Sequence, residues 1–167
     1  MNVLENFPDS SRIWIYTAPR PLTIEECEFI SARMANFVAE WAAHGAKLNA
    51  DFEILYKRFI VIAVDEGPQN ATGCSIDSCV HELQKIGTEL NIDFFDRMVV
   101  VYRDEENNNM VVSCKMNELK NMIADGDFTP QTIVFDNTIL TLGELRSRWE
   151  NTAGNTWMKR YFSAVKS

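Results

Sequence analysis

Apolar residues recur at three- and four-residue steps over residues 27–41, a spacing that predicts an amphipathic helix. Thr23 suits the N-cap of this helix, and Glu26, three residues later, completes a capping-box signature. Gly45 is a natural stop signal. His44 would then lie in the last helical turn, where partial positive charge is favoured.

Two segments near this helix have the pattern of β-strands. Residues 12–17 are rich in β-formers and are followed by two prolines, which cannot continue a ladder. Residues 51–67 alternate at first and then become the continuous apolar run 59–64, which is typical of a strand buried on both faces. No turn residue divides this second segment, so we expect one long, bent strand. A split near Lys57 is the alternative.

The two interpretations of residues 51–67 have different consequences for the fold. A hairpin would make a split βαβ unit with two antiparallel long helices, and would bring His44 near Cys74. A single strand would favour parallel helices, with His44 at the far end.

The second long helix is predicted from about residue 75 to residue 90. Its apolar face consists of Ile76, Cys79, Val80, Leu83, Ile86 and Leu90. Downstream, the pattern indicates a hairpin over 96–116, a helix over 117–124, a strand over 132–135, and helical or irregular segments over 142–149 and 157–164. The order β-α-β-α-β-β-α-β-α predicts an α+β fold in which a mixed β-sheet is flanked by helices.

Composition changes this picture mainly by excluding classes of protein. With 167 residues, of which 46% are hydrophobic, the chain is expected to form a single domain, residues 1–167, with a real core. A formal charge of −8 argues against a surface that binds nucleic acid or an anionic membrane. No apolar stretch is long enough for a membrane span, and no secretory signal is evident, so we expect a cytoplasmic protein with reduced thiols.

The carboxy-terminal part is a local exception to the acidic charge. From Glu144 onward, five basic residues alternate with aromatic ones, including Trp157 and Tyr161. This composition allows docking to RNA or protein, in which case Arg160→Glu should abolish a salt-sensitive binding. An apolar helix face that closes the core, with its charges outside, is the simpler interpretation.

The segment ATGCSIDSCVH, residues 71–81, holds the most suggestive chemistry in the chain. Asp77 and His81 share the polar side of the predicted helix, and Cys74 joins them if the helix begins early enough. A thiol at a helix N-terminus beside an imidazole has the elements of a thiolate nucleophile. The structural interpretation is favoured, however, with Ser75 as N-cap, Asp77 at the positive end of the helix dipole and His81 in solvent.

Other ligands are poorly supported by the same segment. A phosphate at the helix start would meet the negative charge of Asp77. Cys74 and Cys79 lack the spacing of a zinc knuckle, and a metal would also need His44 and His81 to meet. We therefore expect no metal and no cofactor. Asp65 and Glu66 end a buried strand, which is where open sheets place ligand-binding groups.

The segments RIWIY, WAAHGAKL, YKRFIVIAVDE, GCSIDSCVH and NTWMKRYF together resemble a family of uncharacterised bacterial proteins that often carries the label "ABC transporter ATPase". The resemblance covers nearly the whole chain and implies no activity or catalytic residue. None of the seven glycines has another glycine five residues later, so the phosphate-binding loop of such an ATPase is missing. ATP hydrolysis by that mechanism is excluded.

The absence of a complete catalytic constellation leads to the functional hypothesis. We expect a non-catalytic domain that binds a small molecule or a protein partner. The alternative is a thiol-dependent enzyme with Cys74 as nucleophile, His81 or His44 as base, and Asp77 as the group that orients the base.

Overall fold

The structure, a computed structural model, describes residues 3–163. The chain has two compact units: the first comprises Met1–Asp96 and Leu140–Glu144, and the second comprises Arg97–Ile139 and Leu145–Ser167. Compactness does not test independent folding, so the expectation of a single domain stays a prediction.

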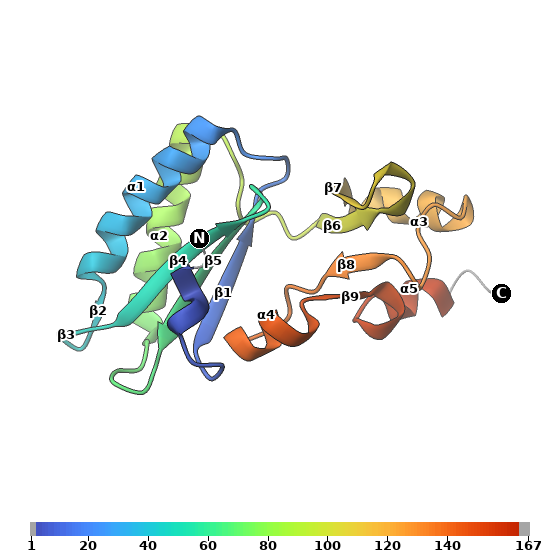
Figure 1. Cartoon of the computed structure of the whole chain (residues 1–167). Helices are drawn as coiled ribbons and strands as arrows, with labels where there is room; N and C mark the ends of the chain where they lie inside the picture. The colour runs from blue at the N-terminus through green and yellow to red at the C-terminus, as the bar shows by residue number, and fades with distance from the viewer. Residues whose placement is uncertain (1–2, 164–167) are drawn as a thin grey trace. The chain divides into compact units, whose positions relative to one another are not determined.

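The first unit is built on a three-stranded sheet in the order β1-β5-β4 (Figure 1). β1 (Arg12–Thr17) and β4 (Asn49–Leu55) both pair in the antiparallel sense with β5 (Phe59–Asp65). The two outer strands are therefore parallel to each other, and the chain crosses between them to give a split βαβ unit. The prediction of one long strand is wrong, and the alternative of a hairpin is confirmed.

The turn of this hairpin has an unusual sequence. Tyr56 and Lys57 have φ angles of 55° and 52°. The turn is closed by a hydrogen bond from the Arg58 N–H to the Leu55 carbonyl oxygen, at 3.0 Å. Two successive positive φ angles normally attract Asn and Gly. Because neither is present, the pattern of the sequence did not mark the turn.

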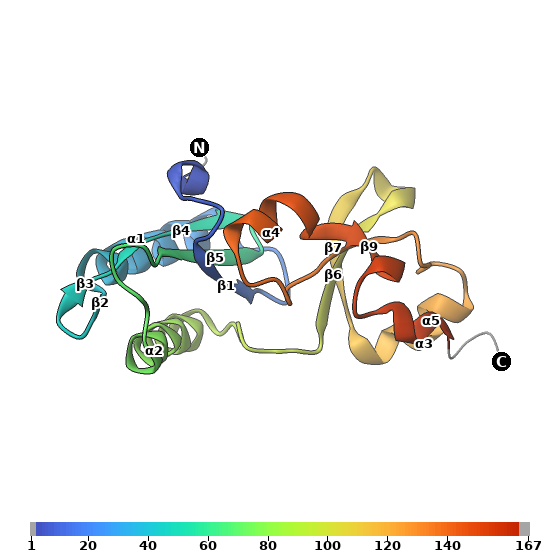
Figure 2. The same ribbon diagram turned by 90° about the horizontal axis from the view of Figure 1, so that it is seen from below.

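Two long helices, α1 (Ile24–Glu40) and α2 (Gly73–Leu90), cover one face of this sheet (Figures 1 and 2). They run antiparallel, as the split βαβ connection requires. Two contacts between the helices agree with this direction. The Trp41 Nε1–H, just after α1, donates to the Ser75 carbonyl oxygen at the start of α2, at 2.8 Å. Arg33 in α1 forms an ion pair with Glu89 near the end of α2, at 2.6 Å.

The core of the first unit lies between the helices and the sheet. Ile60, Ile62 and Val64 of β5 are fully buried there, against Met34 of α1 and Leu83 of α2. The alternate residues of β5, Phe59, Val61 and Ala63, point to the other face of the sheet and are also fully buried. The continuous apolar run in the sequence reports this burial on both faces.

The outer edge of β1 is covered by a segment that is distant in the sequence. Arg12 and Thr141 form an antiparallel bridge, and the Ile13 N–H donates to the Leu140 carbonyl oxygen at 3.0 Å. On the other edge strand, the Val3 N–H of η1 (Val3–Asn6) donates to a Glu53 carboxylate oxygen of β4 at 3.3 Å. The pairing with Leu140 and Thr141 reduces the exposure of the β1 edge, and unpaired sheet edges invite association.

The first helix begins as predicted but ends earlier. Thr23 is the N-cap, and its side chain and that of Glu26 form the reciprocal bonds of a capping box. The helix stops at Glu40, because Trp41 takes an extended conformation with its indole anchored to α2. His44 is therefore not in a helical turn, as the sequence suggested. It lies in the turn between β2 (Ala42–Ala43) and β3 (Ala46–Lys47).

The second helix begins two residues earlier than predicted. Its N-cap is Thr72 rather than Ser75, and Ser75 is the third helical residue and is buried. Thr72 and Ser75 exchange capping bonds, which is why the cap moves upstream. Cys74 therefore belongs to the helix.

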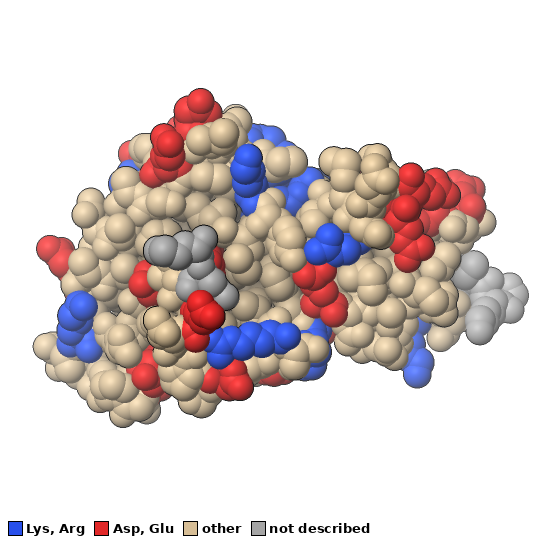
Figure 3. All heavy atoms as spheres, viewed as in Figure 1, with Lys and Arg blue, Asp and Glu red and all other residues tan. Residues whose placement is uncertain are grey.

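The second unit contains a four-stranded sheet in the order β7-β6-β8-β9. The predicted hairpin corresponds to β6 (Val99–Asp104) and β7 (Met110–Lys115), joined through the short helix η2 (Glu105–Asn107). Acidic side chains gather over this turn (Figure 3). β8 (Ile133–Phe135) and the short strand β9 (Glu150–Thr152) complete the sheet.

The helices of the second unit are short: α3 (Met116–Ala124), α4 (Leu142–Arg148), which begins in the first unit, η3 (Ala153–Asn155) and α5 (Lys159–Ser163). Part of the core of this unit consists of Val100, Leu119, Phe128, Val134, Ala153, Met158 and Phe162. The predicted helical segment 157–164 is observed from Lys159 to Ser163, and its last residue lies outside the described part of the chain. The sequence did not predict β9.

The helices and open antiparallel sheets make an α+β fold, as predicted. Every strand pair among residues 3–163 is antiparallel, however, and the strands form separate sheets rather than one mixed sheet. Consecutive strands joined by tight turns, such as β4 with β5, can only pair in the antiparallel sense.

Candidate functional site: a polar cleft at the start of α2

Three of the four predicted site residues lie on one exposed stripe of α2. Cys74, Asp77 and His81 follow one another at steps of three and four residues, and all three are exposed. The stripe forms because the helix begins at Gly73, early enough to include Cys74.

His44, the fourth predicted residue, lies beside the segment that leads into α2. It is exposed, has a φ of 51°, and lines a cleft of about 580 Å³ together with residues 66–72. The antiparallel helices are the cause of this proximity, because they place the end of α1 next to the start of α2. His81, by contrast, is eight residues along α2 from its first residue, Gly73, and does not line this cleft.

Side-chain bonds to the backbone hold the floor of the cleft. The Gly67 N–H donates to Asp65 Oδ1 at 3.0 Å, and the Ala71 N–H donates to Glu66 Oε2 at 2.9 Å. Asp65 and Glu66, the acidic pair at the end of β5, therefore organise the loop. Their oxygens accept bonds that would otherwise be left to water.

The capping box continues this rigid wall into the helix. The Thr72 N–H donates to Ser75 Oγ at 2.7 Å, and the Ser75 N–H donates to Thr72 Oγ1 at 3.3 Å. The indole of Trp41 holds the carbonyl of Ser75 from the other side. The cleft is thus preformed, which lowers the entropic cost of binding a ligand.

Several polar groups at this cleft are not used by the fold. Within residues 3–163, the imidazole of His44 and the side-chain amide of Asn70 form no hydrogen bond. The thiol of Cys74, which lies beyond the lining residues in the first turn of α2, forms none either. An imidazole and an amide both donate and accept hydrogen bonds. The cleft therefore offers both kinds of partner to a polar molecule.

The four cysteines are free and differ in their exposure. Burial raises the pKa of Cys79 to about 12 and that of Cys114 to about 11, and adjacent carboxylates add to both shifts. Burial also raises the pKa of Cys27. Cys74 is the exposed one, and it lies two residues after Thr72, which lines the cleft.

No group of three His, Cys, Asp or Glu side chains among the described residues is arranged to hold a metal ion.

At the carboxy terminus, the Arg160 guanidinium lies 5.8 Å from the ring centre of Trp157 and 5.1 Å from that of Tyr161. These residues form a local cation–aromatic cluster, so the basic and aromatic side chains that the sequence suggested for docking contact one another.

Sequence reasoning missed the loop residues of the cleft, among them Gln69 and Asn70. In the stretch EGPQNATG, only Glu66 was singled out from the sequence, as part of the acidic pair that ends the buried strand, and the residues after it carry no periodic pattern. Its position between a buried strand and a helix start was a usable signal, since open sheets often bind ligands at such ends.

No protein-family model matches the chain, and no curated protein or solved structure is significantly similar to it. Within residues 3–163, none of the helices has the length and apolarity needed to cross a membrane. The resemblance noted from the sequence stays a prediction.

Proposed function

We propose that this chain is a non-catalytic binding protein, and that it holds a small polar molecule in the cleft between His44 and residues 66–72. The supporting observation is the arrangement of that cleft. Two segments far apart in the sequence line it, the fold fixes its backbone, and the imidazole of His44 is left for a ligand.

The lining residues indicate the chemistry of the ligand. His44, Gln69, Asn70 and Thr72 supply donors and acceptors, and Glu66 supplies the one acidic side chain among the lining residues. A compact molecule with several hydrogen-bonding groups fits this lining, because each group would find a partner on a preformed wall.

Binding without catalysis is favoured by the surroundings of the thiol. Within the described residues, the Cys74 side chain forms no hydrogen bond with either imidazole. A nucleophile of this type requires a base within hydrogen-bond reach.

A thermal-shift screen tests the proposal. The wild type, His44→Asn and His81→Asn would be heated with amino acids, dicarboxylates and monosaccharides at millimolar concentration. Asn tolerates the left-handed backbone at position 44, so the variant removes the ring without straining the turn. His81→Asn makes the same change at an exposed position outside the cleft.

We expect at least one compound to raise the melting temperature of the wild type and of His81→Asn, with a clearly smaller rise for His44→Asn. Stabilisation of all three proteins to the same extent would place the ligand elsewhere. The absence of any stabilising compound would contradict the proposal.

A thiol-dependent enzyme is the second candidate, favoured by one observation: the exposed thiol, Cys74, belongs to the first turn of α2, next to the cleft. An enzyme of this kind needs a thiolate well below pH 8.5, roughly the pKa of a free thiol. The rate of alkylation would be measured against pH for the wild type and Cys74→Ser. A Cys74-dependent rate that is already high at pH 6 would support the enzyme, and a rate that rises only near pH 8.5 would exclude it.

A further inference from the structure

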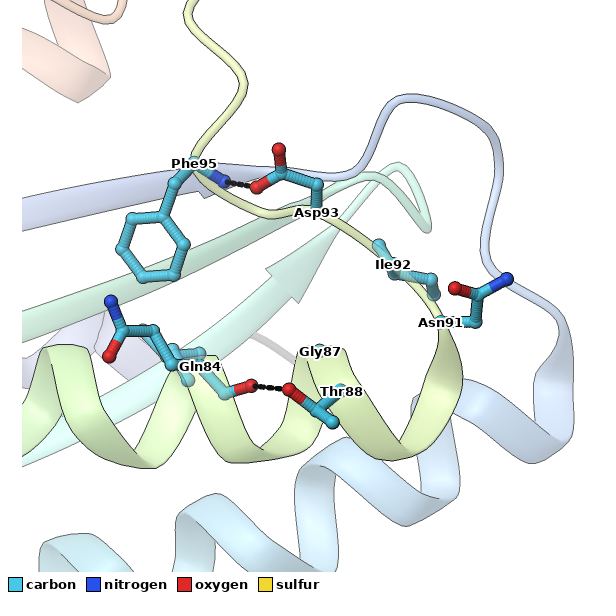
Figure 4. Close-up of a pocket in the computed structure, with 8 residues that line it drawn as sticks. Gln84, Gly87, Thr88, Asn91, Ile92, Asp93 and Phe95 are labelled. Atoms are coloured by element: carbon cyan, nitrogen blue, oxygen red, sulfur yellow. Dashed lines mark hydrogen bonds between the residues drawn. The ribbon is translucent and has the colours of Figure 1, made fainter.

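A second cleft of the first unit lies along the carboxy-terminal half of α2. Its volume is about 610 Å³, and it is bordered by the helix and by residues 91–93 and 95, which follow it (Figure 4). It shares no lining residue with the His44 cleft. Gln84 reaches from the helix toward the ring of Phe95, so these two side chains border the same space (Figure 4).

The wall opposite the helix is held in place by the way α2 ends. Asn91 takes a left-handed conformation with a φ of 55°, and the Ile92 N–H donates to the Gly87 carbonyl oxygen at 2.8 Å. The Phe95 N–H donates to Asp93 Oδ1 at 2.8 Å. The ring of Phe95 also packs edge-on against Tyr16, with 5.4 Å between ring centres. These contacts make the cleft a feature of the folded unit.

Two groups in this cleft are available to a ligand. The side-chain amide of Gln84 forms no hydrogen bond within residues 3–163. Phe95 is 36% exposed, which is high for a phenylalanine ring. An exposed ring stacks on planar groups, and a glutamine amide can donate and accept at once.

Charge restricts the ligand further. Asp93 is the one charged residue that lines the cleft, and the carboxy-terminal end of α2 carries partial negative charge. Phosphates and other anions are therefore disfavoured. Glutamine pairs in a bidentate manner with N6 and N7 of adenine, and aromatic side chains stack on bases.

We propose that this cleft binds an uncharged adenine compound, such as a nucleoside, with Phe95 stacked on the base and Gln84 paired with its N6 and N7 edge. This inference does not depend on the function proposed for the His44 cleft.

Amide NMR spectra of the labelled full chain, titrated with adenosine, test the inference. We expect saturable shifts at residues 84–95, including the side-chain NH₂ of Gln84. Gln84→Ala should weaken binding about tenfold, because a bidentate contact between a side chain and a base usually contributes a free energy of about that size. Gln69→Ala, the same change in the other cleft, should bind adenosine like the wild type.

Two further arms make the test specific. Phe95→Leu keeps an apolar side chain but removes the stacking surface, so it should also weaken binding. Adenosine monophosphate should bind more weakly than adenosine at moderate salt, because its phosphate would be repelled. The inference is overturned if adenosine gives no saturable shifts, if the shifts centre on residues 44 and 66–74, or if the monophosphate binds as tightly as the nucleoside.

Discussion

Exposure of individual side chains separates the four thiols. Cys74 is exposed, Cys27 and Cys114 are partly buried, and Cys79 is buried. Burial raises the pKa of each of the other three thiols, so only a small fraction of each is in the reactive thiolate form near pH 8. We expect iodoacetamide at limiting concentration to label Cys74 first, as measured by peptide mass spectrometry. Cys74→Ser should lack the fast phase, and early labelling of Cys79 or Cys114 would contradict the assigned burial.

One carboxylate, Glu26, couples the cap of α1 to pH. Its bond with the Arg20 guanidinium, at 2.8 Å, and its bond with the Thr23 N–H lower the pKa of Glu26 to about 2. Because the pKa of Glu26 is lower in the folded state, the ionised carboxylate stabilises the fold at pH values above the unfolded-state pKa, about 4.3. This stabilisation is lost as the pH falls toward 2.

The corresponding variant is Glu26→Gln, which keeps a capping amide but loses the charge. We expect it to lower the free energy of unfolding by about 1 kcal/mol at pH 7, with the difference shrinking between about pH 4.3 and pH 2. Urea unfolding across this range measures the effect. Glu25→Gln is the matched control, since Glu25 is an exposed acid in the same helical turn. An equal loss in both variants at pH 7, or a loss independent of pH, would refute the role of the pair.

At the scale of elements, the β4–β5 turn should be open to improvement. Lys57 is held at a φ of 52°, where a side chain is strained and glycine is not. Lys57→Gly should therefore raise the free energy of unfolding by about 0.5–1 kcal/mol. This net gain is the strain energy that is relieved in the folded turn minus the conformational entropy that glycine adds to the unfolded chain. Thermal unfolding measures this change. A clear destabilisation would mean that the turn does not have the conformation described.

Two glycines of α2 should respond in opposite ways to alanine. A Cβ at Gly87 would lie 2.4 Å from the Ile92 carbonyl oxygen, whereas a Cβ at Gly73 would meet no atom within 4 Å. Gly87→Ala should destabilise the protein by about 1–3 kcal/mol because backbone atoms must move. Gly73→Ala should be neutral or stabilising by up to about 1 kcal/mol. Chemical unfolding of the wild type and the two variants measures these changes. A Gly87→Ala variant as stable as the wild type would show that the chain after α2 does not fold back as described.

At the scale of the whole molecule, the elements were more predictable than their pairing. Strand 12–17 and the capping box at Thr23 follow from local patterns, because alternation, prolines and caps act over a few residues. The hairpin at Tyr56 was not predictable in the same way, since its positive φ angles are imposed by strand pairing rather than by turn residues. The short strand β9 was missed for a similar reason: it exists because β8 offers an edge.

The candidate site shows the same division. The exposed stripe of Cys74, Asp77 and His81 was predictable from helical spacing. The position of His44 was predicted only under the hairpin alternative, because it depends on the antiparallel helices and on the indole of Trp41 ending α1. The residues that border His44 come from a loop whose pattern carries no period, so only the fold brings them together.

The central claim is that the imidazole of His44 faces a bound ligand, and the chain offers a direct measurement because it contains two histidines. Their ring C2–H signals would be followed by one-dimensional NMR while the most stabilising compound from the thermal screen is added, with His44→Asn assigning the signals. We predict that the His44 signal shifts and saturates while the His81 signal stays in place. A stationary His44 signal at saturating ligand would contradict the claim.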